Sequence, residues 1–255
     1  MNNKRRKYSC CLAARDLQCK LLHFYHKQWH YVAVLFRKPG RQHQVNQFMH
    51  EESETARIEA FSDGVFAIAI TLLVLSIKVP NPDVVSDRGL AISLAALWPA
   101  YLAFFTSFVT VLVIWVQHHW IFTQIRRADH PLLYWNGLLL LFVTFVPFPT
   151  GLLAEYLLHP EAKVAASLYT GNFLIISVVF HGLWRHVSKS GGLLPSSAIS
   201  SSQDEKARIT KHYQIAPLFY LAAFGLSFVS EIAGISSCLL VAFFFALRGW
   251  PTRVR

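Results

Sequence analysis

Four polar side chains lie inside stretches of this chain that are otherwise apolar enough to cross a membrane: Asp63, His118, His119 and Asn136. A carboxylate inside a bilayer costs about 2.5–3.5 kcal/mol on insertion scales, so Asp63 requires a partner. An imidazole and an amide are suitable partners, because each can hydrogen-bond to a carboxylate and to the other. Such a group could lock membrane helices together, or it could relay protons or ions along them.

Position along the helices predicts that these groups meet. Asp63 lies six residues beyond the charged Arg57. The His118–His119 pair comes shortly before the basic turn at Arg126, and Asn136 follows the same turn. All of these groups therefore lie at a similar depth, where buried polar groups need hydrogen-bond partners.

Other interpretations of the same residues stay open. Ser62 or Asp63 could cap a helix that begins later. The His118–His119 pair, with Trp115 and Trp120 beside it, could belong to an interfacial aromatic belt. We expect no metal site, because adjacent helical residues diverge by about 100° and no carboxylate or thiol is spaced to complete a tetrahedron.

The composition predicts the helices that carry these residues. Hydrophobic residues make up 54% of the 255 residues, charged residues make up only 15%, and the mean hydropathy is +0.37. This predicts an all-α membrane protein with six transmembrane helices per subunit. The expected spans are Ile58–Ile77, Leu97–Phe122, Leu132–Leu153, Val164–His186, Tyr213–Ser230 and Ile232–Leu247.

The first span, Ile58–Ile77, has two different faces. When it is projected at about 100° per residue, one side is a continuous stripe. This stripe consists of Phe61, Gly64, Ile68, Thr71, Leu72 and Leu75. The Ser62-Asp63 pair points away from the stripe, together with Ala69, Ile70 and Leu73.

The net charge of +10 is concentrated in residues 1–48, which hold ten Lys and Arg and one acid, Asp16. This leader could be a transit peptide, a disordered juxtamembrane segment attracted to anionic lipid, or the product of a start codon assigned too early. In the last case Met49 begins the protein, and the six-span domain is 49–255. Because the rest of the chain is nearly neutral, we expect no nucleic acid partner.

The basic residues after the leader predict an orientation. With a cytoplasmic amino terminus, eleven Lys and Arg fall on the cytoplasmic side and only Lys78, Arg88 and Lys163 fall outside. This asymmetry is typical of multi-pass membrane proteins. Six spans then place both termini in the cytoplasm.

Residues Arg57–Leu75, RIEAFSDGVFAIAITLLVL, resemble the RxxxFSD first-helix signature of the transmembrane protein 175 potassium channel family, in its short prokaryotic form with a single repeat. Three further elements are similar to the second and third helices of that family. They are Trp115 with His118-His119, Trp135-Asn136 and Pro147-Phe148-Pro149-Thr150.

The resemblance implies a potassium-permeable channel in a bacterial plasma membrane, with a six-span unit from Met49 to Leu247. It implies a homotetramer in which the first helix of each subunit lines a central pore, with K⁺ and lipid as partners and no cofactor. By position, Ile68 corresponds to a hydrophobic constriction, Thr71 to a polar layer, and Leu72 and Leu75 to further apolar rings. The structural polar network corresponds to Arg57, Phe61, Ser62, Asp63, His118, His119 and Asn136.

Missing motifs narrow the function classes. The sequence has no TVGYG filter, no Arg-rich span and no GxxxxGK[ST] loop. It also has no set of nucleophile, base and orienting residue, so we do not expect an enzyme. The alternative is a secondary transporter or proton pathway that uses Asp63 and the His118–His119 pair.

Overall fold

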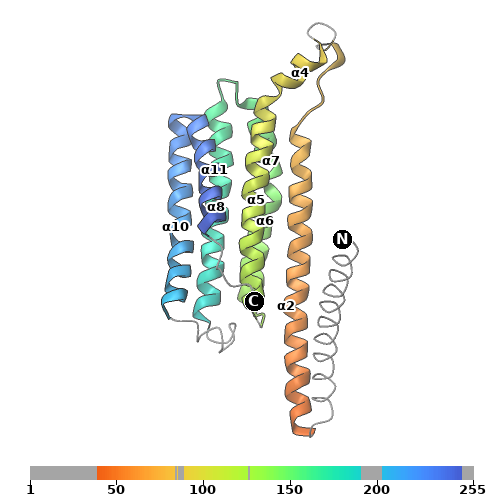
Figure 1. Cartoon of the computed structure of the whole chain (residues 1–255), viewed down its shortest axis with the longest axis vertical. Helices are drawn as coiled ribbons and strands as arrows, with labels where there is room; N and C mark the ends of the chain where they lie inside the picture. Colours follow the sequence, from red (N-terminus) through yellow and green to blue (C-terminus); the bar gives the residue numbers. More distant parts are fainter. Residues whose placement is uncertain (1–38, 84, 86–88, 126, 191–202, 249–255) are drawn as a thin grey trace, which may run out of the picture. The chain divides into compact units, whose positions relative to one another are not determined.

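The computed structural model describes residues 39–83, 85, 89–125, 127–190 and 203–248 (Figure 1). Most of the predicted leader, and the Gly/Ser-rich stretch 191–202, lie outside the described residues. The chain divides into two compact units, Met1–His50 and Glu51–Arg255. The second unit holds every residue of the candidate site.

All regular secondary structure in the described residues is helical. The elements in chain order are α2 (Pro39–Leu72), the 3₁₀ turn η1 (Leu73–Ser76), α4 (Leu90–Ala96), α5 (Trp98–Gln124), α6 (His130–Phe145), α7 (Pro147–Tyr156), α8 (Ala162–Lys189), α10 (Gln203–Val229) and α11 (Glu231–Arg248).

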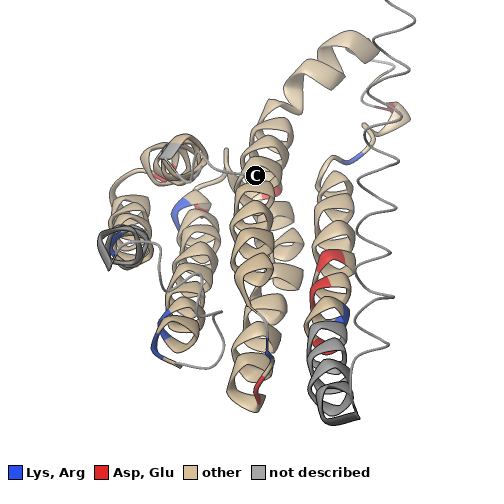
Figure 2. Cartoon of the chain, turned by 60° about the horizontal axis from the view of Figure 1, so that its bottom comes forward, with Lys and Arg blue, Asp and Glu red and all other residues tan. Residues whose placement is uncertain are grey.

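Four segments of the described chain are long and apolar enough to cross a membrane. They are Glu54–Ser76, Trp98–Gln124, His130–Tyr156 and Ala162–Lys189. Two shorter apolar helical segments, Tyr213–Val229 and Glu231–Leu247, coincide with the fifth and sixth predicted spans. Charged residues are absent from most of the helix bodies (Figure 2). The protein is therefore an all-α, multi-pass membrane protein, because helices satisfy their own backbone hydrogen bonds in lipid.

Two elements differ from the sequence-based expectation. Leu90–Ala96, which lies in the connection between the first two expected spans, forms the short helix α4 before α5. The third span is two helices, because Pro147 has no N–H group to continue the hydrogen-bond ladder of α6. The carbonyl of Val143 instead accepts from the N–H of Val146 at 3.2 Å, and Pro147 begins α7, where its missing N–H costs nothing.

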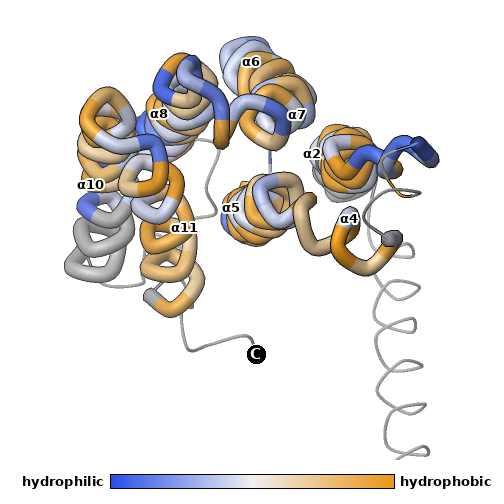
Figure 3. The backbone as a smooth tube through the Cα atoms, turned by 90° about the horizontal axis from the view of Figure 1, so that it is seen from above, coloured by the Kyte–Doolittle hydropathy of each residue, from blue (hydrophilic) through white to orange (hydrophobic). Residues whose placement is uncertain are grey.

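Helices α8, α10 and α11 pack together, and α8 also contacts α6 and α7 (Figure 3). Tyr169 and Phe173 of α8 lie in the centre of this core, fully or almost fully buried. Buried polar groups join the helices within it. The hydroxyl of Ser107 on α5 lies 2.8 Å from that of Thr150 on α7, and the hydroxyl of Tyr213 on α10 donates to Gln117 on α5 at 2.9 Å. This core supports α5 and α6, which in turn contact α2.

The close approach of α10 and α11 depends on Gly234. A Cβ atom at this position would lie 2.8 Å from the Cβ atom and 2.9 Å from the Cα atom of Ser227. We expect Gly234→Ala to lower the free energy of unfolding by about 1–3 kcal/mol, because backbone must move to admit the methyl group. Gly225→Ala on α10 is the matched control, since a Cβ atom there meets nothing within 4 Å. Thermal unfolding in detergent compares the two variants, and equal midpoints would show that the contact is not tight.

Candidate functional site: the polar face and the exposed stripe of the first span

A chain of buried hydrogen bonds joins α2, α5 and α6. The side-chain amide of Asn136 donates to the Ser62 hydroxyl at 3.0 Å, and its oxygen lies 2.9 Å from Nε2 of His118. Ser62 in turn donates to the carbonyl of Ile58 at 2.8 Å. Ser62 and His118 are fully buried and Asn136 almost fully. The structure therefore brings three of the predicted network residues together, one from each helix.

The hydrogen bonds define which ring nitrogen of His118 carries the proton. Because the Asn136 nitrogen donates to Ser62, its oxygen must accept, so Nε2 of His118 carries the proton. Nδ1 of His118 is buried and has no hydrogen-bond partner among the described residues. The imidazole ring stacks on Phe122, with ring centroids 4.3 Å apart and an interplanar angle of 24°. His118 thus acts as a neutral donor packed between apolar rings.

The partner of Asp63 is not the one that depth along the helices predicted. Its Oδ1 atom accepts from the indole nitrogen of Trp115 at 2.8 Å. His118 and Asn136, which we expected to satisfy this carboxylate, bond to each other instead, and Asn136 also donates to Ser62. The reason is rotational: Ser62 and Asp63 diverge by about 100° around the helix, so only one of them faces the α6 side.

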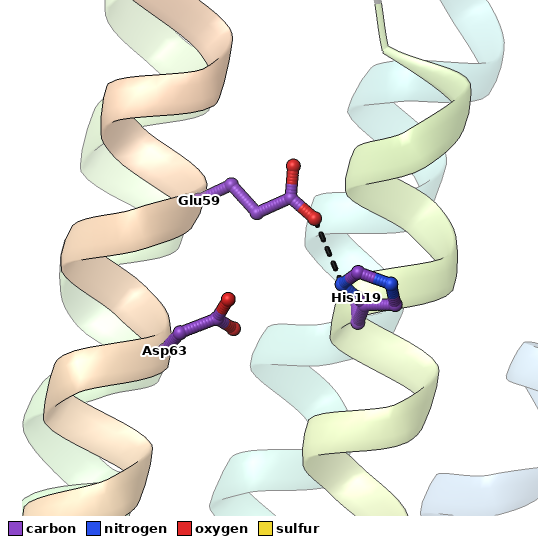
Figure 4. A group of neighbouring side chains, drawn as sticks. All are labelled: Glu59, Asp63 and His119. Atoms are coloured by element: carbon purple, nitrogen blue, oxygen red, sulfur yellow. Dashed lines mark ion pairs between the residues drawn. The ribbon is translucent and has the colours of Figure 1, made fainter. Parts of the chain in front are cut away.

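His119 belongs to a second polar cluster, with Glu59 and Asp63 (Figure 4). Its Nδ1 atom lies 2.8 Å from Oε1 of Glu59, and its ring stacks on Trp115. One ligand-type atom from each of Glu59, Asp63 and His119 lies within 4.8 Å of the other two. Our premise that no carboxylate would complete a ligand set beside these histidines is wrong. Sequence reasoning missed Glu59, although its spacing of four residues from Asp63 places both on one helical face.

Arg57 and Phe61 occupy a different environment from the buried network. Both are exposed, and they line a groove between α2 and α6. Neither takes part in the hydrogen bonds that join Ser62, Asn136 and His118. Within the single chain, these two predicted network residues therefore lie outside the core of the cluster.

The stripe of the first span is exposed in the single chain. Ile68 is 59% exposed and Leu75 is 69% exposed, and Thr71 and Leu72 lie between them on the surface. The opposite face is buried, and its members are Phe66, Ala69 and Leu73. The Thr71 hydroxyl donates to the carbonyl of Ile68 at 2.9 Å, so its oxygen retains acceptor capacity toward the exposed face.

Leu75 differs from the other stripe residues in its backbone. It lies in η1, a 3₁₀ turn, rather than in α2. A 3₁₀ turn advances by about 120° per residue, so a projection at 100° does not strictly apply there. Leu75 is nevertheless exposed, and the stripe continues to the end of the span.

Comparison with known proteins places this arrangement in a family. The family model described as "Endosomal/lysosomal potassium channel TMEM175" matches residues 57–147, the segment that holds the polar clusters and the stripe. The chain is 58% identical over 198 residues to a potassium channel of Chamaesiphon minutus, covering 78% of this chain and 96% of that protein. This chain belongs to the TMEM175 family.

Two further relatives of this TMEM175 family member agree with the assignment. A potassium channel of Streptomyces collinus is 38% identical over 205 residues, covering 80% of this chain and 97% of that protein. The crystal structure of a lysosomal potassium-selective channel TMEM175 homologue from Chamaesiphon minutus is similar with a TM-score of 0.70 and 56% identity. That match covers 77% of this chain and 98% of the solved chain. The family is therefore one of membrane channels and not of enzymes.

Proposed function

We propose that this protein is a potassium-permeable cation channel, in which the first spans of four subunits line a central pore and Ile68 forms a hydrophobic constriction. The observation that carries the proposal is the two-sided first span. Its stripe is exposed while its opposite face is anchored by buried polar groups. In the most apolar segment of this span, only 22% is buried within the chain, whereas 39% or more is buried in the corresponding segment of each of the other three long spans. The names of its relatives as potassium channels support the choice of ion.

The chemistry of the stripe suits a pore without a carbonyl filter. A ring of four isoleucines would narrow the pore and strip water from a passing ion, so size and dehydration would decide permeation. Thr71 lies one helical turn beyond Ile68, where four hydroxyl oxygens could replace part of the hydration shell. Leu72 and Leu75 would form further apolar rings.

The polar clusters would hold the pore helix from behind. Ser62 and Asp63 are bonded to α6 and α5, on faces that point away from the stripe. Arg57 and Phe61, which remain exposed in one subunit, would contact the neighbouring subunit. In this arrangement the network sets the rotation of α2, which determines the residues that face the ion.

The alternative, a proton pathway through Asp63, His118 and His119, is less well supported. His118 is bonded to Asn136, whose amide does not readily exchange protons, and Asp63 is bonded to the indole of Trp115, which does not titrate. Glu59, Asp63 and His119 form a separate cluster, in which the ring of His119 stacks on Trp115.

Flux through purified protein in liposomes tests the proposal. With a K⁺ gradient alone, we expect an electrogenic flux that does not require a proton gradient and that is smaller when Na⁺ replaces K⁺. We propose that no cofactor is needed, so purified protein and lipid should suffice. Saturable flux that is coupled to protons would instead support the alternative of a secondary transporter or proton pathway.

The predicted leader provides a separate test. We propose that both termini are cytoplasmic in a bacterial plasma membrane and that residues 1–48 are not required for conduction. They carry most of the net charge but none of the stripe or cluster residues. Protein that begins at Met49 should give the same oligomer mass and the same K⁺ flux per mass of protein as the full chain. A dissociated oligomer or a lost flux would contradict this.

A further inference from the structure

The cluster of Glu59, Asp63 and His119 has the composition of a divalent metal site, which the proposed channel function does not require. It combines one imidazole nitrogen with two carboxylates, and it draws these from two helices, α2 and α5. Even with a protonated imidazole, two carboxylates leave the cluster with an excess of negative charge. Mixed nitrogen and oxygen ligands of this kind suit Zn²⁺ and related first-row ions.

Neighbouring groups already orient two of the three side chains. The Trp115 indole nitrogen donates to Oδ1 of Asp63 at 2.8 Å, and the Trp115 ring stacks on His119 with centroids 5.9 Å apart and an interplanar angle of 26°. Outer hydrogen bonds to ligating carboxylates are a regular feature of metal sites, because they fix the ligand in place. Trp115 offers no metal ligand itself, so it is a separate group that orients the ligand side chains from outside the cluster.

The separations of the ligand atoms and the exposure of the side chains also suit the binding of a metal ion. The three ligand atoms lie within 4.8 Å of one another, and bonds of about 2.0–2.2 Å to a tetrahedral ion require only a small rotation of the side chains. The side chain of His119 is 50% exposed and that of Glu59 is 23% exposed, so a hydrated ion can reach them. A water molecule would complete the coordination.

We propose that Glu59, Asp63 and His119 form a binding site for a divalent transition-metal ion such as Zn²⁺ or Co²⁺. The bound ion would link α2 to α5 on the side of α2 that faces away from the exposed stripe. The ion would replace the proton shared by Nδ1 of His119 and Oε1 of Glu59, which lie 2.8 Å apart. The bridge would join the face of α2 opposite Ile68, so the ion would not lie among the stripe residues.

Titration of the purified full-length protein with Co²⁺ tests the site, because the visible absorption of Co²⁺ reports its coordination. The leader also contains histidines and cysteines, so the site is measured as the difference between wild type and variants. We expect Glu59→Gln and His119→Gln each to remove one Co²⁺ per chain or to weaken its binding at least about tenfold. His130→Gln is the control, because His130 is an exposed histidine on α6 outside the cluster.

Thermal unfolding gives a second measurement that does not depend on ion flux. Zn²⁺ should raise the unfolding midpoint of the wild type and of His130→Gln, and a chelator should reverse the rise, because an ion that binds only the folded state stabilises it. Glu59→Gln removes a charge that pairs with the half-exposed His119, so this variant should fold but show a smaller rise. Equal Co²⁺ binding and equal Zn²⁺ shifts in wild type, Glu59→Gln and His119→Gln would overturn the proposal, whatever the channel assay shows.

Discussion

Replacing Ile68 by asparagine is expected to raise K⁺ flux several-fold and to reduce discrimination between K⁺, Na⁺ and larger cations. Ile68 is the exposed residue of the stripe that we place at the constriction. An amide would hold water where the proposed ring of four isoleucine side chains would exclude it, so ions would pass with more of their hydration shell. Flux in liposomes with each cation measures both effects. Thr71→Ala should instead leave the flux similar and weaken the preference for K⁺ over Na⁺.

Cysteine substitutions give a control for the same prediction. Cysteines at 68 and 75 should react with water-soluble thiol reagents and block flux. Cysteines at 66 and 73 should not, because Phe66 and Leu73 are fully buried against the rest of the subunit. The native Cys238 is buried, and the other three native cysteines lie in residues 1–48, so the unsubstituted protein treated with the same reagents gives the baseline. A silent Ile68→Asn, or equal block from both faces, would place the pore elsewhere in the helix bundle.

Asn136→Ala should lower the free energy of unfolding, with little change in ion preference. Among the described residues, Asn136 is the side chain that bonds to both Ser62 and His118. Its removal leaves the His118 N–H buried without an acceptor, which costs about 1–3 kcal/mol. Asp63→Ala should act in the same direction through the partly buried indole of Trp115. Thermal unfolding and oligomer mass in detergent measure the loss.

Thr144→Ala on α6 is the matched control for Asn136→Ala. Thr144 is exposed, and among the described residues its hydroxyl bonds only to the carbonyl of Leu141 within its own helix. We expect the control to unfold like the wild type. An Asn136→Ala or Asp63→Ala protein with an intact oligomer, an unchanged unfolding midpoint and an altered K⁺/Na⁺ preference would move these residues from the packing network to the ion path.

The sequence alone predicted the features that depend on local pattern. Long apolar runs predicted a helical membrane protein, and four of the expected spans are long apolar segments in the structure. The RxxxFSD signature pointed to the family that the comparisons confirm. The periodicity of the first span separated Ile68 and Thr71 from Ser62 and Asp63, and the structure exposes the first pair. These features are readable because helical periodicity is a property of a single segment.

The tertiary structure decided which polar groups meet. Depth along the helices placed Asp63, His118 and Asn136 at one level, but depth leaves the rotation of each helix undetermined. In the structure, Ser62 faces Asn136, Asp63 faces Trp115, and Glu59 faces His119. Each pairing depends on the rotation of α2 relative to α5 and α6, which the packing of many apolar side chains sets together. A rotation of about 100° exchanges one neighbouring residue for the next, so a hydrogen-bond partner cannot be assigned from a single helix.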